Sequence, residues 1–203
     1  MSQALQERSF VNPLVLGLPR GGVPVAFEVA LGLEAQLDIM VVRKLGVPGH
    51  EELAMGAVAS GDVRILNEAV IASMRISSEA INKAIVTEQI EVDRREKDLR
   101  AGRFPVPISG KEVIIVDDGL ATGASMKAAI VAARIGNCKS VHVAVPVGAA
   151  STCVQVRSLC ESLSCLHQPQ DLLAVGAWYD DFSPTTDDDV RRLLREAAGG
   201  DHA

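Results

Sequence analysis

Short apolar runs alternate with amphipathic segments along most of the chain. Runs of β-branched and aliphatic residues predict strands at 13–18, 38–42, 113–116, 140–147 and 161–168. Apolar residues at helical spacing predict helices over 23–31, 77–100, 123–135, 150–160 and 185–200. Strands that alternate with helices indicate βαβ units. The expected fold class is therefore α/β, a mostly parallel central sheet with helices on both faces.

Other segments depart from this alternation. Residues 52–66 resemble a β-hairpin with its turn at Ser60–Asp62, and Asn67 can cap a short helix over 67–74. Residues 101–110 form a Pro/Gly loop, and 171–184 are irregular. The end of the long helix, 88–100, is dense in both charges, which is typical of a solvated face with i,i+4 ion pairs. A partner-binding or dimer-contacting helix is the alternative.

Composition limits the class of protein. The chain has 203 residues, which suits one domain, and its residues are 48% hydrophobic but only 3% aromatic. The core must therefore be aliphatic, as in a buried parallel sheet. A net charge of −6 argues against a nucleic-acid surface but allows a small anion in one basic pocket.

The sequence also bears on location and metals. The N-terminal ten residues are polar, unlike a secretory signal, and no apolar run is long enough to span a membrane. We therefore expect a cytoplasmic protein with no membrane partner. The four cysteines form no C-x-x-C pair, and Cys165 with His167 lacks a second ligand cluster. Reduced structural thiols are the simpler interpretation.

The most informative stretch is VIIVDDGLATGAS, residues 113–125. A buried strand runs into two adjacent acids, then a loop of small residues, then a helix. Small residues followed by a helix N-terminus expose backbone N–H groups to an anion, and Thr122 and Ser125 add hydroxyls. Adjacent carboxylates at Asp117 and Asp118 make sense if they accept hydrogen bonds from a sugar diol or help to hold Mg²⁺. An N-cap with a solvated turn acid is the alternative.

Two further segments carry cations near expected strand ends. LPRGG, residues 18–22, combines two glycines with Arg20, whose planar guanidinium suits phosphate. Arg43 and Lys44 leave the expected strand 38–42 and enter a Gly/Pro loop over 46–49. A plain Pro/Gly turn and ordinary surface cations are the alternatives. Taken together, the three strand ends predict a site for a sugar that carries phosphate at both ends.

These motifs resemble the type I phosphoribosyltransferase family. VIIVDDGLATGAS is similar to its phosphoribosyl diphosphate (PRPP) motif, and family features extend over about 15–182. The fit is particularly close to uncharacterised bacterial phosphoribosyltransferase-domain proteins with LPRGG, VRKLGVPG, ELAMGA and VGAWYDDF. The resemblance implies a single domain over 1–203, with a hood from about 168–185 over the base.

The resemblance also implies roles for individual residues. Asp117 and Asp118 would bind the ribose hydroxyls, and Arg20 and Lys44 would be the catalytic cations on the diphosphate. The wider PRPP site would comprise Pro19, Arg20, Gly21, Gly22, Arg43, Lys44, Gly119, Leu120, Ala121, Thr122, Gly123, Ala124 and Ser125. The diphosphate loop of this family often holds a cis peptide, which here would fall at Pro19–Arg20. Mg²⁺ would be held mainly by PRPP, with Asp180 as its protein ligand.

The acceptor is less defined. Ala121 stands where 6-oxopurine enzymes have a third acid, so the loop looks more like the adenine and orotate enzymes. Leu173 occupies the position that often stacks on the base, and Trp178 and Tyr179 could stack or merely pack. The general base is also open, with His50 and Glu51 as candidates.

The expected activity is transfer of the 5-phosphoribosyl group from Mg–PRPP to a nitrogenous base or related nitrogen acceptor, with release of diphosphate. The alternatives are a PRPP-binding regulatory protein without turnover and a phosphoribosyl-linked hydrolase or phosphorylase. By analogy with the family, we expect a homo-oligomer, most simply a dimer.

Overall fold

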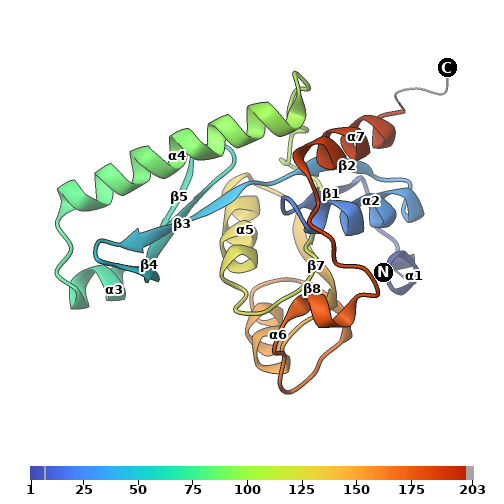
Figure 1. The fold of residues 1–203 in the computed structure, drawn as a ribbon. Helices are drawn as coiled ribbons and strands as arrows, with labels where there is room; N and C mark the ends of the chain where they lie inside the picture. Colours follow the sequence, from blue (N-terminus) through green and yellow to red (C-terminus); the bar gives the residue numbers. More distant parts are fainter. Residues whose placement is uncertain (7, 200–203) are drawn as a thin grey trace.

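The central sheet is parallel throughout, as the alternation of strands and helices predicts. The computed structural model describes residues 1–6 and 8–199, so Gly200, the last residue of the expected helix 185–200, lies outside it. The sheet has the order β2-β1-β6-β7-β8. Its strands are β1 (Pro13–Gly17), β2 (Gln36–Ile39), β6 (Glu112–Val116), β7 (Ser140–Val147) and β8 (Ser162–His167). Figure 1 shows the helices on its two sides.

Alternate side chains of the strands enter two separate cores. Val15 and Ile114 join one core, while Leu14 and Ile115 join the other. The first core takes side chains from α2 (Gly22–Gly32), α4 (Ser78–Arg100) and α7 (Asp187–Ala197); the second takes them from α5 (Ala124–Ile135) and α6 (Ala150–Arg157). Both are aliphatic, which accounts for a composition rich in Val, Ile, Leu and Ala. A short helix, α1 (Ser2–Gln6), packs against α2.

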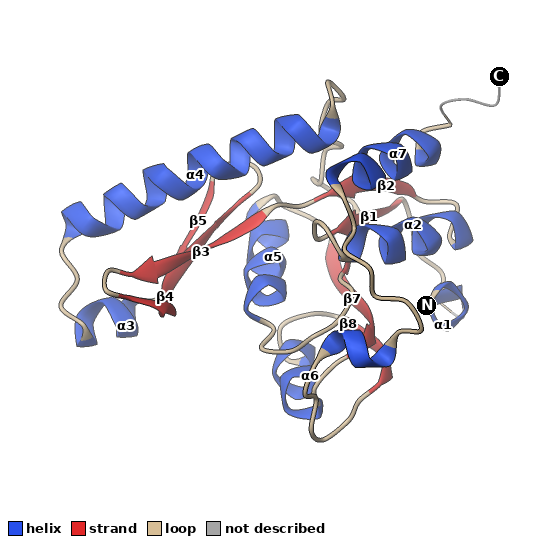
Figure 2. Cartoon of the chain, viewed as in Figure 1, coloured by secondary structure: helices blue, strands red, loops and turns tan. Residues whose placement is uncertain are grey.

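A second, antiparallel sheet projects from the first. Its strands are β3 (Val42–Val47), β4 (His50–Ala59) and β5 (Val63–Leu66). With α3 (Glu68–Ser73) and α4 they form an extension that we call the arm, residues 42–100 (Figure 2). The predicted hairpin around Ser60–Asp62 is confirmed by the β4–β5 pairing.

The predicted strand 38–42 is wrong, because these residues belong to two strands in different sheets and to the link between them. β2 stops at Ile39, where Met40 N donates to Gly17 O at 3.1 Å, and a new strand in the other sheet begins at Val42. Arg43 and Lys44 therefore lie within an antiparallel strand of the arm. The apolar run 39–42 continues through the change of sheet, so periodicity does not reveal it.

The long charged helix begins and ends as predicted. Ser77 Oγ accepts from Ala80 N at 3.2 Å, and Ala101 stops the helix in a left-handed conformation. At the other end of the chain, Thr186 and Asp189 form a capping box for α7. No helix among residues 1–6 and 8–199 is long and apolar enough to cross a membrane.

A buried ion pair joins the arm to the central sheet. Asp38, at the end of β2, accepts from Arg100 Nε at 2.9 Å and from Val106 N at 2.8 Å. Arg100 also donates to Ile39 O at 3.0 Å and to Glu96 at 2.6 Å. Asp38 and Arg100 are 5% and 8% exposed, so Asp38 depends on Arg100 for compensation of its charge, while Asp38 and Glu96 together compensate Arg100.

We expect Asp38→Asn to destabilise the protein by about 1–3 kcal/mol, because Arg100 loses the more buried of its two carboxylate partners and keeps only Glu96. Asp98→Asn, which removes an exposed carboxylate on the same helix, should cost under about 1 kcal/mol. Urea unfolding followed by circular dichroism measures both. Equal costs for the two variants would contradict the role given to Asp38.

Candidate functional site

The parallel pairing of β1 and β6 brings two of the predicted loops together. Gly17 lies opposite Val116 in the register, and Leu18 N donates to Val116 O at 2.9 Å. The loop after β1 and the acids after β6 therefore leave the sheet side by side at its carboxyl edge. The peptide bond between Pro19 and Arg20 is cis, as the resemblance implies.

Two glycines allow this loop to touch the acids directly. A Cβ on Gly21 would lie 1.9 Å from Asp118 Oδ2. A Cβ on Gly22 would lie 2.7 Å from Val116 O and 2.8 Å from Asp117 Cα. Gly22 faces backbone and has no space for a side chain, whereas a side chain at Gly21 would have to displace the Asp118 carboxylate.

The acid pair is electrostatically costly by itself. Burial first, and then the neighbouring charge of Asp118, raise the pKa of Asp117 to about 8. Burial also raises the pKa of Asp118. One backbone donor, Asp118 N, reaches Asp117 Oδ1 at 2.9 Å. Carboxylates held this way gain from a ligand that donates hydrogen bonds to them.

The loop over 119–125 has the form of an anion site. Gly123 has φ of +70°, which the sequence meets with glycine, and α5 begins at the next residue. Thr152 Oγ1 donates to Ala121 O at 2.7 Å and holds the loop from α6. Leu120 is 1% exposed and anchors the loop in the core, where its N donates to Val147 O and its O accepts from Ala149 N, both at 2.9 Å. The following residues, 121–125, present backbone N–H groups beside a helix N-terminus.

A cleft of about 560 Å³ opens beside Asp118. One wall is the loop after β1 and the start of α2, and the other is the segment 179–185 after the 3₁₀ helix η1 (Val175–Trp178). Tyr179 Oη donates to Asp118 O at 2.6 Å, so this segment is attached directly to the acid pair. The cleft is lined by Arg20, Gly21, Pro24, Val25, Asp118, Tyr179, Asp181, Phe182, Ser183, Pro184 and Thr185.

The predicted hood residues separate into two groups. Tyr179 lines the cleft, but Leu173 is 97% exposed and does not. Trp178 packs on His167 instead, with ring centroids 5.4 Å apart. Asp181 lines the cleft in place of the predicted Asp180. Ser183 donates to Asp181 from both its N and its Oγ, at 2.9 and 2.6 Å, and this lowers the pKa of the Asp181 carboxyl.

The predicted cations lie in different places. Arg20 lines the cleft and pairs with Asp187, Nη1 to Oδ1, at 3.5 Å. Arg43 pairs with Glu88 of α4 at 2.8 Å, and neither Arg43 nor Lys44 lines the cleft. The candidates for general base, His50 and Glu51, are exposed at the start of β4, also in the arm.

Sequence reasoning missed Asp181, Phe182 and Asp187 as neighbours of the site. The run YDDFSP and the acids that open α7 were visible signals. Their relevance comes from the path of the segment 179–187 past the loop after β1, which no local pattern predicts. Among the described residues, no cluster of three or more His, Cys, Asp and Glu side chains could hold a metal ion by itself.

Comparison with known proteins identifies relatives of similar sequence and structure. The sequence model of the protein family described as the phosphoribosyl transferase domain matches residues 1–174 of this chain. Two curated proteins of Mycobacterium tuberculosis, from strains CDC 1551 and H37Rv, are each 43% identical over 197 residues. Their names describe them, provisionally, as phosphoribosyl transferases. The match covers 97% of this chain but 44% of each relative, so the chain spans under half of their length.

A solved structure has the same fold over nearly its full length. The crystal structure of TT1426 from Thermus thermophilus is 38% identical, with a TM-score of 0.86. The match covers 96% of this chain and 92% of that one. The overall architecture of this chain is therefore one that this relative shares.

The raised pKa of Asp117 predicts a pH dependence of stability. The folded protein keeps a proton on Asp117 up to a pH of about 8, whereas the unfolded chain releases it near 3.8. The unfolded state therefore binds fewer protons between these values, and stability falls as pH rises through this window. Asp117→Asn should remove this contribution. The free energy of unfolding of the variant, measured with urea, should therefore rise relative to that of the wild type between pH 5 and pH 8.

The control is Asp62→Asn, in the exposed β4–β5 turn. It should follow the wild-type pH profile. Parallel profiles for wild type and Asp117→Asn would show that Asp117 is ionised in the folded protein.

Proposed function

Because this chain belongs to the phosphoribosyl transferase domain family, we propose that it binds Mg–PRPP and transfers the 5-phosphoribosyl group to a nitrogen acceptor. The observation that carries the proposal is the contact between the loop after β1 and the acid pair, with Gly21 packed on Asp118. The two carboxylates suit the ribose hydroxyls, and the adjacent loop suits a diphosphate. Their contact therefore matches a ribose that carries a diphosphate leaving group at C1.

Each part of the substrate has a complementary part of the site. The ribose hydroxyls donate to Asp117 and Asp118, which favours the ionised carboxylates despite their burial. The 5-phosphate accepts from backbone N–H groups of the loop 121–125 at the start of α5. The diphosphate lies against the loop 19–22 and the guanidinium of Arg20.

Catalysis in this arrangement is mostly electrostatic. As the bond from C1 to the diphosphate breaks, positive charge develops on the ribose ring and negative charge on the leaving group. Asp117 and Asp118 lie on the ribose side, and Arg20 lies on the leaving-group side. Arg43 and Lys44 remain candidates for the leaving group only if the arm closes over the site, because neither lines the cleft here.

The cleft has oxygen ligands suitable for Mg²⁺. Asp118 and Asp181 both line it, and hydrogen bonds from Ser183 favour the ionised form of Asp181. Two carboxylates suit a hard cation that also keeps oxygens of its substrate. When bound, Mg²⁺ supplies charge neutralisation for the diphosphate.

The acceptor side of the cleft is formed by the hood. Tyr179 and Phe182 supply aromatic surface, with ring centroids 5.0 Å apart, which suits a planar ring. In this proposal the acceptor is a nitrogenous base, the chain is a cytoplasmic transferase of one domain, and it acts as a homo-oligomer.

The direct test is diphosphate release from Mg–PRPP with a panel of purines, pyrimidines and other nitrogen acceptors. We expect release with at least one of them. Asp118→Asn should weaken PRPP binding in calorimetric titration by about tenfold or more, because it removes a charged acceptor for a ribose hydroxyl. Tight PRPP binding without release for any acceptor would favour a regulatory PRPP-binding protein. Unchanged affinity in the variant would refute the diol assignment.

Asp187→Asn tests the pairing of Arg20. Asp187 holds Arg20 in an exposed pair that diphosphate must displace, so the variant should bind PRPP up to about fivefold more tightly. The control is Asp188→Asn, the next residue of α7, which pairs with Arg191 instead. Equal effects would mean that general charge, and not the Arg20 pair, sets the affinity.

A further inference from the structure

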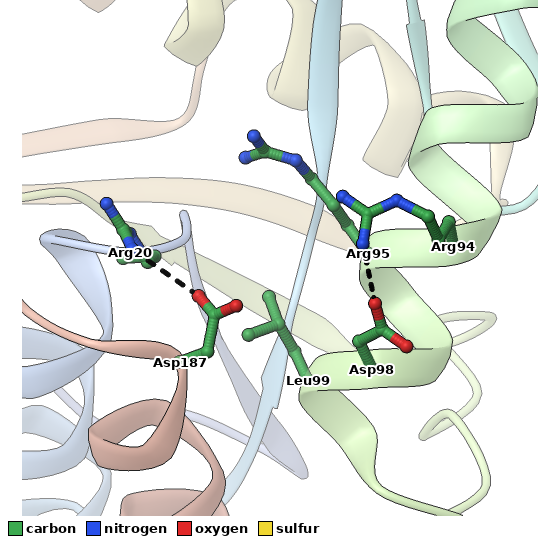
Figure 3. Close-up of a pocket in the computed structure, with 6 residues that line it drawn as sticks. All are labelled: Arg20, Arg94, Arg95, Asp98, Leu99 and Asp187. Atoms are coloured by element: carbon green, nitrogen blue, oxygen red, sulfur yellow. Dashed lines mark hydrogen bonds and ion pairs between the residues drawn. The ribbon is translucent and has the colours of Figure 1, made fainter.

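A second hollow adjoins the cleft on the other side of Arg20. It has a volume of about 150 Å³ and lies between the loop after β1, the end of α4 and the start of α7 (Figure 3). Its lining is Arg20, Arg94, Arg95, Asp98, Leu99 and Asp187. Three arginines therefore meet at one hollow, and the carboxylates of Asp98, Asp187 and the neighbouring Glu91 balance their charge.

The three arginines differ in how fully their donors are used. Arg94 is occupied on all three nitrogens, by Glu91 through Nε and Nη2 and by Asp98 through Nη1. Arg95 donates only from Nε, to Glu91 Oε1 at 2.8 Å. Among the described residues, no acceptor meets its two terminal nitrogens, and Figure 3 shows its guanidinium extending from α4 toward the side of Arg20.

The backbone that carries Arg95 is firmly positioned. Arg191 Nε of α7 donates to Asp98 O at 2.8 Å, which joins α7 to α4 at a residue that lines the hollow. One turn further on, Arg100 makes the buried pair with Asp38. Glu91 orients Arg95 from the preceding turn, and hydrogen bonds from Arg94 and Arg95 lower the pKa of Glu91 to about 2, so it stays ionised. Arg95 is thus oriented through its Nε, and the N–H groups of its two terminal nitrogens remain available to a ligand.

We infer that Arg95 is a diphosphate-binding residue, which together with Arg20 holds the distal phosphate of the ligand across this hollow. The inference rests on the proposed function and extends the site to α4. The sequence pattern of that helix end by itself indicates only a solvated, charged face. Asp187 pairs with Arg20 in this structure and is displaced when the ligand enters. A planar guanidinium with two free terminal nitrogens matches two oxygens of one phosphate group.

The same chemistry could serve a free anion, such as inorganic phosphate or diphosphate, instead of the diphosphate of PRPP. The two sources differ in what lies beside the hollow. For PRPP, the ribose end must occupy the acid pair at the same time, so binding at Arg95 and at Asp118 belongs to one ligand. For a free anion, the two sites are independent.

The experiment is calorimetric titration of wild type, Arg95→Gln and Arg95→Lys with PRPP, diphosphate, inorganic phosphate and ribose 5-phosphate, all with Mg²⁺. Arg95→Gln should weaken PRPP and diphosphate by about tenfold or more and change ribose 5-phosphate by less than about twofold. The affinities of Arg95→Lys for PRPP and diphosphate should lie between those of the wild type and Arg95→Gln, because lysine keeps the charge but loses the planar pair of terminal donors. The matched control is Arg192→Gln, an exposed arginine of α7 paired with Glu196.

Each outcome decides between the two proposals. If wild type binds PRPP and Arg95→Gln binds diphosphate as tightly as wild type, the inference is wrong and the proposed function stands. An equal loss of ribose 5-phosphate affinity would show a structural role and also overturn the inference. If wild type binds diphosphate or phosphate through Arg95 but does not bind PRPP, the anion site stands and the proposed function falls.

Discussion

The buried pair of Asp38 and Arg100 is the interaction on which the relation between the two parts of the molecule depends. Asp38 ends a strand of the parallel sheet, and Arg100 ends the long helix of the arm. Because both charges are almost fully buried, loss of Arg100 would leave Asp38 without its cation, and loss of Asp38 would leave Arg100 with Glu96 alone. The pair therefore sets where α4 crosses the sheet edge, and with it the place of the arginines one turn earlier.

The candidate site depends on a different constraint, which is steric. The loop after β1 lies against the acid pair so closely that a Cβ at Gly22 would meet backbone atoms and a Cβ at Gly21 would meet the Asp118 carboxylate. This packing places a loop suited to phosphate beside two carboxylates whose burial raises their pKa values. A ligand that donates hydroxyl hydrogen bonds to the acids and offers negative charge to the loop offsets the cost of that burial, which is the physical case for a ribosyl diphosphate.

Much of the fold could be predicted from local patterns. The strand 113–116, the helix from Ser77 to Arg100 and the cap at Thr186 follow from residue periodicity and capping chemistry, which act over a few residues. The change of sheet after Ile39 could not, because an apolar run that passes from one sheet to another keeps the same pattern. That is why Arg43 and Lys44 were expected at a ligand edge and lie in the arm.

The sequence by itself determined the chemistry available: an acid pair before a small-residue loop, a glycine pair beside Arg20, and an aliphatic α/β scaffold. Only the tertiary structure decided which distant groups share the space. It put Tyr179 and Asp181 at the cleft, left Leu173 exposed, and brought Arg95 to the hollow beside Arg20. These neighbours come from helix packing and from the path of an irregular segment, which depend on contacts between residues far apart in the chain and leave no periodic trace in it.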